Sequence, residues 1–328
     1  DRGMATEGKV SEETQDRYAR YVDMWAVAGL HPSNIDVLTK LKSAEDRQFS
    51  KNMGITGKVI AEDKEERTKE ESHIFGIRTD IWKPSKQEKE GALNMIKKRR
   101  KEELKKEIKK RGGRLNKEQK AQLESKMRDD LTMTMESSDV DKSRLVIKLF
   151  RSTGKNISWK GTLEELSVRE VHQSLGSKKA LITFAVNLSG YEYLIHIQQC
   201  RRFFRPAVFS FAYIDEKSDQ VWYVDLKKYW VSLGIDYHVE AQGVRIGKID
   251  GKLLALGTDS RVKITEPNLV NDQRFLDLVS LFAASIGYHR RIWRNIRRRV
   301  RRIKKGDSLH VIEDEELWLL KNPRRLVR

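Results

Sequence analysis

The stretch FLDLVSLFAASI, residues 275–286, is apolar around nearly its whole circumference when it is drawn as a helix. Asp272 precedes it as the predicted N-cap, and the helical pattern continues to Lys305. A helix that is apolar on all sides must be enclosed by other parts of the protein. We therefore predict that this stretch lies in the lumen of the fold, with its core side chains at Phe275, Leu278, Val279, Phe282 and Ile286.

The second half of the same predicted helix is basic. Residues 290–305 contain eight arginines and two lysines and no acidic residue. Ile292, Ile296, Val300 and Ile303 nevertheless recur at helical spacing and define one apolar stripe. The sequence thus predicts one helix that is a core element at its start and a basic amphipathic rod at its end.

Upstream of the helix, the pattern after Ser143 is typical of β-structure. Short apolar runs are punctuated by Gly, Asp and Ser, which favours a barrel or a sandwich. A helical segment interrupts the runs at residues 162–175. The predicted strands cover residues 145–151, 156–160, 180–187, 191–198, 206–214, 220–226, 235–241, 243–249, 252–256 and 261–265.

An internal repeat supports a hairpin architecture. The segment WVSLGIDYHV at 230–239 reads against LLALGTDSRV at 253–262, with Leu, Gly, Asp and Val at matching offsets. A self-similar β unit is typical of folds that repeat equivalent hairpins. We predict equivalent turns at Leu233-Gly234 and at Leu256-Gly257.

Six segments together match the pattern of a known family: FAYID (211–215), VWYV (221–224), KYWVSLG (228–234), GVRIGKI (243–249), LLALG (253–257) and the helix that follows Asp272. They resemble the tubby-like superfold, specifically its LURP-one-related and phospholipid-scramblase-like branch. The resemblance implies a closed antiparallel barrel threaded by a hydrophobic C-terminal helix. It also implies binding of phosphoinositides or other anionic partners more than catalysis. The chain departs from the family where the helix continues into the Arg-rich rod and the tail at 309–328.

The N-terminal part of the chain has no counterpart in that family. Residues 1–84 read as a helical and irregular extension, with a helix over residues 11–30 and a surface segment over 54–83. Residues 85–143 read as a charged helical hairpin. The predicted fold is therefore α+β, with an antiparallel tubby-like barrel and its core helix over 144–288 and an Arg-rich helix and tail over 289–328.

The charge of the chain indicates anionic partners. The 328 residues carry a formal net charge of +18. Residues 1–144 hold 33 basic and 28 acidic groups and the remainder hold 33 and 20, so the excess lies mainly in the second part. A basic field recruits nucleic acid, acidic lipid or acidic protein. The single cysteine, Cys200, excludes an intrachain disulfide, and an intracellular, reducing compartment is expected.

The Arg-rich rod is the candidate binding site. Arginine pairs phosphates bidentately and stacks on bases, which favours RNA, with Trp293 as a stacking platform. Two other interpretations stay open: an interfacial helix on acidic lipid, and a rod docked on the acidic residues 313–316. The candidate nucleic-acid-binding residues are Arg290, Arg291, Trp293, Arg294, Arg297, Arg298, Arg301, Arg302, Lys304 and Lys305.

A second candidate patch surrounds the aromatic pair Phe203-Phe204. Three arginines flank the pair, which combines cations with possible stacking surfaces. A solvated loop would have the same composition, so this alternative stays open. The candidate residues are Arg201, Arg202 and Arg205.

A metal-dependent nuclease is a further interpretation. The spacing of three residues resembles that of a nuclease motif. Asp215 and Asp225 would be two metal-binding carboxylates on adjacent strands, and Lys227 would be the lysine that supports the attacking water. The residues around Asp215 also have the composition of a hairpin turn, and we favour that interpretation. The seven histidines include no pair at metal-ligand spacing, so no catalytic residue, metal or cofactor is predicted.

Together these features predict a non-enzymatic, polyanion-binding structural protein. We expect an RNA-binding component of a large ribonucleoprotein assembly, with neighbouring proteins of that assembly as further partners. The alternative is a peripheral membrane protein that binds acidic phospholipids or phosphoinositides through a tubby-like barrel.

Overall fold

The computed structural model of the chain places its described residues almost entirely in the first of two units. The chain divides into a unit of residues 1–82 and 140–328 and a unit of residues 83–139. The predicted charged hairpin at 85–143 lies almost entirely outside the described residues. Those described are 19–25, 53–62, 71–83, 90, 94, 143–153, 156–200, 206–230, 235–254, 257–307 and 312–321.

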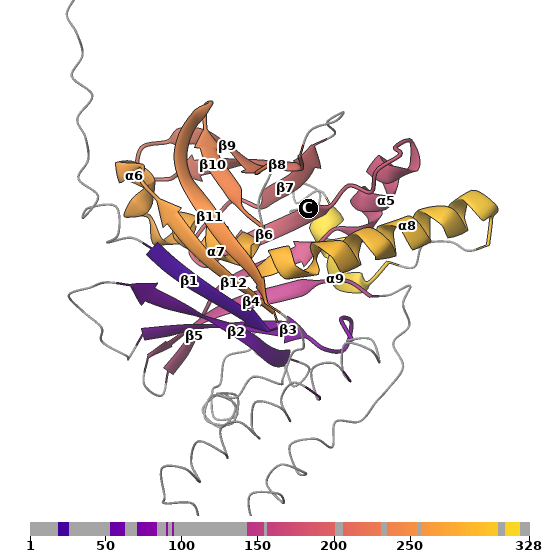
Figure 1. Cartoon of the computed structure of the whole chain (residues 1–328), viewed down its shortest axis with the longest axis horizontal. Coiled ribbons are helices and arrows are strands. Elements are labelled where there is room, and N and C mark those ends of the chain that lie inside the picture. Colours follow the sequence, from indigo (N-terminus) through magenta and orange to yellow (C-terminus); the bar gives the residue numbers. More distant parts are fainter. Residues whose placement is uncertain are drawn as a thin grey trace, which may run out of the picture. The chain divides into compact units, whose positions relative to one another are not determined.

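Twelve antiparallel strands of the first unit close into one barrel (Figure 1). Each strand pairs with its sequence neighbours, and β1 closes the ring by pairing with both β2 and β12. Closure removes the exposed sheet edges that an open sheet would present. The strands are β1 (Ala19–Trp25), β2 (Met53–Glu62), β3 (Glu71–Arg78), β4 (Val146–Thr153), β5 (Asn156–Glu165), β6 (Thr183–Leu188), β7 (Ile195–Cys200), β8 (Val208–Asp215), β9 (Gln220–Lys228), β10 (Tyr237–Ala241), β11 (Val244–Leu254) and β12 (Gly257–Ile264).

Three strands come from the N-terminal segment for which the sequence predicts helical and irregular structure. The prediction of a helix over 11–30 is wrong at residues 19–25, which form β1. β2 and β3 occupy much of the segment predicted to run irregularly over the surface. Val22 and Trp25 fit a helical spacing. However, β2 and β12 provide hydrogen-bonded partners on both sides of β1, and this pairing outweighs the weak helical propensity of the segment.

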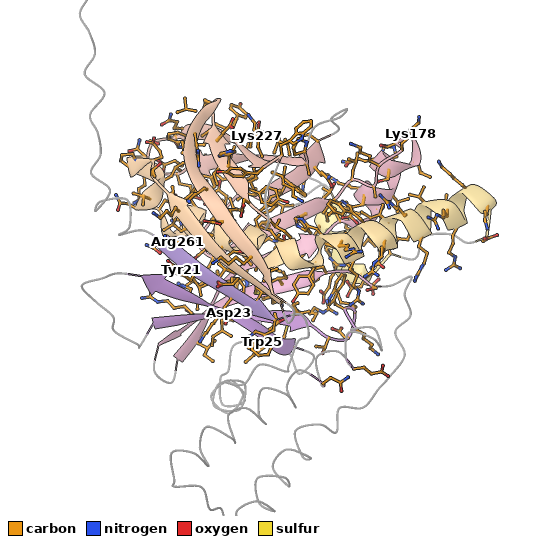
Figure 2. All side chains as sticks on the ribbon, viewed as in Figure 1. Tyr21, Asp23, Trp25, Lys178, Lys227 and Arg261 are labelled. Atoms are coloured by element: carbon orange, nitrogen blue, oxygen red, sulfur yellow. The ribbon has the colours of Figure 1, made fainter. Side chains whose placement is uncertain are left out.

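The seam between β1 and β12 is reinforced on the outside of the barrel. Val22 and Met24 of β1 belong to the core, whereas Tyr21 and Asp23 alternate to the other face (Figure 2). Tyr21 lies opposite Arg261 in the register, and the guanidinium carbon is 5.3 Å from the centre of the tyrosine ring. This cation–π contact stabilises the strand pair that completes the ring.

A helix supplies the centre of the barrel core. α7 (Gln273–Ser285) starts after Asp272, whose carboxylate accepts a hydrogen bond from the amide of Arg274 at 3.0 Å. Every residue from Phe275 to Ser285 is buried, and the helix packs against β1, β4, β5, β6 and β12. The predicted core side chains Phe275, Leu278, Val279, Phe282 and Ile286 are each at most 2 % exposed, which confirms that this stretch is buried.

Aromatic rings connect α7 to further strands. The ring centre of Phe282 lies 5.1 Å from that of Phe209 in β8 and 5.5 Å from that of Tyr237 in β10. Phe275 contacts Tyr213 of β8 at 5.2 Å. All three pairs have the inclined geometry that aromatic quadrupoles favour. The core helix is therefore held by strands on several sides of the barrel.

The helical chain continues past the core to Lys305, as predicted. A 3₁₀ turn, η2 (Ile286–Tyr288), joins α7 to α8 (His289–Lys305). The Tyr288 hydroxyl donates to the Trp25 carbonyl at 2.8 Å and ties this junction to β1. Among the residues that the structure describes, the shorter helices given bounds are α5 (Ser167–Leu175), α6 (Pro267–Val270) and α9 (Asp314–Leu320).

Two details of the predicted hairpins differ from the structure. β11 continues from Val244 to Leu254 and so joins the two strands predicted separately at 243–249 and 252–256, of which residues 255–256 lie outside the described residues. The helix predicted at 162–175 starts only at Ser167, because β5 extends to Glu165. The turn predicted at Leu233-Gly234 lies outside the described residues, so its equivalence with Leu256-Gly257 stays a prediction.

Candidate nucleic-acid interface

α8 presents two opposite faces. Ile292 and Ile296 are fully buried and join the barrel core, and the same face packs against α5. Gly306, at a φ of 74°, ends the helix in the left-handed conformation that glycine adopts without strain. Figure 1 shows α8 extending from the end of α7 beyond the barrel. The helix is thus fixed along one side and open to solvent along the other.

The solvent face of α8 collects the basic side chains. At 100° per residue, these side chains fall within an arc of about 120° opposite the buried isoleucines. None of them has an ion-pair or hydrogen-bond partner among the described residues, and five of them line a shallow groove with Arg302 and Asp307. We call this set the basic face of α8: Arg290, Arg294, Arg297, Arg298, Arg301, Lys304 and Lys305.

Three predicted binding residues are engaged with the fold. The guanidinium carbon of Arg291 lies 4.2 Å from the ring centre of Trp82. The indole of Trp293 packs on the core and donates to the amide oxygen of Gln199 at 3.1 Å. Arg302 is half-buried. These contacts orient the helix. They also leave only the exposed part of the half-buried Trp293 ring available for stacking on a base.

Arg299 is a structural residue in the middle of the Arg-rich rod. Its guanidinium donates to a carboxylate oxygen of Glu165 at 3.2 Å and to the carbonyl of Ser143 at 2.5 Å. Arg299 is 6 % exposed and Glu165 is fully buried. Arg299 follows Ile292 and Ile296 on the same helical face, and this spacing is the sequence signal that distinguishes it from its neighbours.

A buried carboxyl lies close to that ion pair. Burial, reinforced by the adjacent Glu165, raises the pKa of Glu170 well above its usual range. Glu170 accepts a hydrogen bond from the amide of Thr183 at 3.1 Å. A protonated Glu170 leaves Arg299 to balance the single charge of Glu165, which is the arrangement that costs least in a buried site.

The acidic tail is docked on the barrel unit and not on the basic face. Glu316 of α9 is 1 % exposed and accepts from the hydroxyl of Ser167 at 2.6 Å and from the amide of Val168 at 2.9 Å. It thereby satisfies donors at the start of α5, which has no side-chain cap of its own. Glu313 accepts from Arg144 at 3.1 Å and pairs with Arg78 at 2.9 Å.

Arg144 is the centre of this docking contact, and sequence reasoning missed it. Its guanidinium is almost fully buried and pairs with Glu164 at 2.8 Å as well as with Glu313. Burial alone would lower the pKa of Arg144, but Glu164 and Glu313 outweigh it and raise the pKa. Sequence periodicity cannot identify the buried position of Arg144, because its partners come from β5 and from the acidic tail.

The three predicted nuclease residues do not converge on one site, because Asp215 lies apart from the other two. Asp215 lies opposite Gln220 beside the β8–β9 turn and accepts from the Ser218 hydroxyl at 2.7 Å. Asp225 lies opposite Ser210, five residues further along β8 or about 17 Å away, and accepts from its hydroxyl at 2.6 Å. Lys227, labelled in Figure 2, pairs with Glu240, and its Nζ also lies 3.8 Å from a carboxylate oxygen of Asp225. The two aspartates are thus too far apart to share one metal ion.

The second predicted patch, at Arg201, Arg202 and Arg205, lies outside the described residues. Within the described part of the chain, no helix combines the length and apolar character needed to span a bilayer.

Comparisons with protein-family models, with curated proteins and with solved structures find no match to this chain.

Proposed function

We propose that the basic face of α8 binds the phosphate backbone of RNA, and that the protein is a non-enzymatic component of a ribonucleoprotein assembly. The observation that carries the proposal is a row of seven exposed cations on one face of a docked helix, without partners among the described residues. From Arg290 to Lys305 the row spans about 22 Å. Because the opposite face is packed on the barrel, little ordering is needed when a polyanion binds.

The arginine content supports RNA as the polyanion. Five of the seven side chains are arginines, whose planar guanidinium groups pair phosphates in a bidentate fork and stack on exposed bases. Lys304 and Lys305 add point charges at the free end of the helix. Single-stranded segments offer both phosphates and unstacked bases to such a row.

The packing of α8 argues against the lipid alternative. An interfacial helix places its apolar stripe among the lipid headgroups. In α8 that stripe is already used by the fold, since Ile292 and Ile296 are fully buried. Docking on the protein's own tail is disfavoured as well, because Glu313 and Glu316 have partners on the barrel unit.

The barrel also supports a finer fold proposal. A closed antiparallel barrel with a long, hydrophobic C-terminal helix is consistent with the tubby-like architecture that the sequence resembles. Assignment to the LURP-one-related and scramblase-like branch is part of this proposal. The unpaired thiol of Cys200 fits an intracellular, reducing compartment.

Neighbouring proteins are the second class of proposed partner. Tyr223, Trp230 and Val244 have exposed fractions of 66, 71 and 66 %. Aromatic residues at a solvent-facing position are enriched where proteins contact each other. A component of an assembly would bury such side chains against its neighbours.

The proposal is tested by fluorescence anisotropy with a labelled single-stranded RNA. The variant Arg294→Gln, Arg297→Gln, Arg298→Gln and Arg301→Gln removes four charges from the basic face. The matched control removes four exposed charges elsewhere: Lys178→Gln, Lys217→Gln, Arg245→Gln and Lys252→Gln. We expect the first variant to lose at least about tenfold in affinity and the control to change little.

Vesicles containing acidic phospholipid distinguish the alternative. If the protein binds these vesicles tightly and RNA does not compete, the RNA proposal is wrong and the lipid interpretation replaces it. If both variants bind RNA equally, the charge of the whole molecule and not α8 accounts for binding.

A further inference from the structure

Two carboxyl side chains meet on the buried side of α8. Glu165, at the end of β5, and Glu170, in the first turn of α5, are both fully buried. The amide of Glu170 donates to the Leu166 carbonyl at 3.0 Å, so α5 turns back directly after β5. The amide of Leu166 donates to the Thr183 carbonyl at 2.9 Å, and the Thr183 amide donates to the Glu170 carboxyl at 3.1 Å. These bonds bring the Glu170 carboxyl into hydrogen-bonding contact with that of Glu165.

Three of the four oxygens in this pair accept hydrogen bonds from fixed donors. Glu165 accepts from Arg299 at 3.2 Å and from the Leu145 amide at 2.8 Å, and one oxygen of Glu170 accepts from the Thr183 amide. The other Glu170 oxygen, Oε2, is buried and has no donor among the described residues. Because its neighbour is the Glu165 carboxylate, Oε2 is satisfied only when it carries a proton and donates to that carboxylate.

The charged groups that face this pair include more carboxyls than guanidinium groups. The two guanidinium groups belong to Arg299 and Arg144, and each already has a carboxylate partner. A deprotonated Glu170 would therefore add a buried negative charge that neither of these cations balances. The facing groups are Arg299 from α8, Arg144 from the segment before β4, Glu164 from β5, Glu316 from α9 and Glu313 before it, while β6 contributes the uncharged Thr183.

The proton on this pair is coupled to the docking of α8. The helix packs against α5, and Arg299 connects it to Glu165 (Figure 1). Burial, reinforced by Glu165, raises the pKa of Glu170 in the docked state. If α8 separated from α5, water would reach Glu170 and its pKa would return to the ordinary value of about 4.3. Between that value and the raised pKa the docked state binds one more proton than the open state, so docking is weakened as pH rises through this window.

We propose that the Glu165–Glu170 pair is a pH-sensitive switch: it holds one proton while α8 is docked, and loss of that proton releases α8 from α5. Two carboxylates would then share the single guanidinium of Arg299 in a buried site, and opening the contact to water relieves their repulsion. The pair lies on the side of α8 opposite the basic face. The proposal therefore does not depend on RNA binding there.

Glu170→Gln tests this proposal because an amide reproduces the protonated state. Its oxygen can accept from the Thr183 amide while its NH₂ group donates to Glu165. Hydrogen exchange of the α8 amides, divided by the intrinsic exchange rate at each pH, measures how often the helix opens. Between pH values of about 5 and 9, we expect the opening constant of the wild type to rise about tenfold per pH unit until Glu170 has titrated.

The Glu170→Gln protein should lack this rise. The comparison isolates Glu170, because His289 of α8 and Glu316 of α9 are present in both proteins. Glu192→Gln, which replaces an exposed acid outside the site, is the matched control and should behave as the wild type does.

Equal pH dependence of α8 exchange in the wild type and in Glu170→Gln overturns the proposal. It is also overturned if the α8 amides open only together with those of the barrel strands, because the proton then stabilises the whole unit and not the docking of the helix. If thermal unfolding shows that Glu170→Gln does not fold, the wild type alone decides. In that case, α8 amides whose opening does not increase with pH relative to the barrel strands contradict the switch.

Discussion

Two adjacent arginines of α8 show how position decides the role of a residue. Arg299 lies in the buried ion pair with Glu165, whereas Arg298 is exposed on the basic face. Removing one partner of a buried pair leaves an uncompensated charge, so Arg299→Gln should lower the free energy of unfolding by about 3–5 kcal/mol. Arg298→Gln should change it by less than about 0.5 kcal/mol. Urea unfolding of both variants measures the difference, and equal stabilities would contradict the assignment of Arg299.

At the same scale, His289 should make stability depend on pH. Burial, with a contribution from Lys228, lowers the pKa of His289 to about 3 from its usual value of 6.5. As pH falls through this window the unfolded chain binds a proton that the folded chain excludes. The free energy of unfolding therefore decreases by about 1.4 kcal/mol per pH unit from this group.

His289→Gln removes the titrating imidazole and, with it, this contribution to the pH dependence of the free energy of unfolding. Urea unfolding at a series of pH values between about 6 and 4 should give a shallower loss of stability for the variant than for the wild type. Parallel curves for the two proteins would show that His289 titrates normally in the folded state. The hydrogen bond between the His289 ring and the Ser285 hydroxyl, at 3.0 Å, is lost in the variant and lowers its stability at every pH.

At the scale of elements, Gly257 limits how β12 approaches β1. A Cβ atom at this position would lie 1.8 Å from the carbonyl oxygen of Met24. Because that obstacle is backbone, Gly257→Ala must shift the seam that closes the barrel, and it should cost about 1–3 kcal/mol. Gly176→Ala is the matched control, since its Cβ would meet no atom within 4 Å. A fully stable Gly257→Ala protein, by thermal unfolding, would contradict the tight pairing of β1 with β12.

The elements also show what the sequence could predict. The helix from Asp272 to Lys305 is long and strongly periodic, so its limits, its buried half and its basic half all follow from residue spacing. β1 could not be predicted in this way, because its seven residues fit both a helical and a strand periodicity. Its conformation is decided by its partners in β12, which lie more than 200 residues away in the sequence. The inward side of Arg20 and His73 could not be predicted for the same reason, since it follows only once β1 and β3 are known to be strands.

Within the Arg-rich rod, helical spacing separates the side chains that face the barrel from those that face solvent. Arg299 shares a face with Ile292 and Ile296, and Arg291 and Trp293 flank that face. Their partners come from other parts of the fold. Arg299 pairs with Glu165 of β5, Arg291 lies over Trp82 shortly after β3, and Trp293 donates to Gln199 of β7. Such partners cannot be deduced from helical periodicity, whereas the solvent exposure of the basic face could.

For the whole molecule, the most direct test is the salt dependence of RNA binding. Each single-strand phosphate neutralised by a protein cation contributes about −0.7 to the slope of log affinity against log salt concentration. The variant Arg294→Gln, Arg297→Gln, Arg298→Gln and Arg301→Gln should therefore have a slope shallower than that of the wild type by about 2 to 3 units, while the control with four charges removed elsewhere keeps the wild-type slope. Equal slopes for the two variants would contradict RNA binding by the basic face of α8.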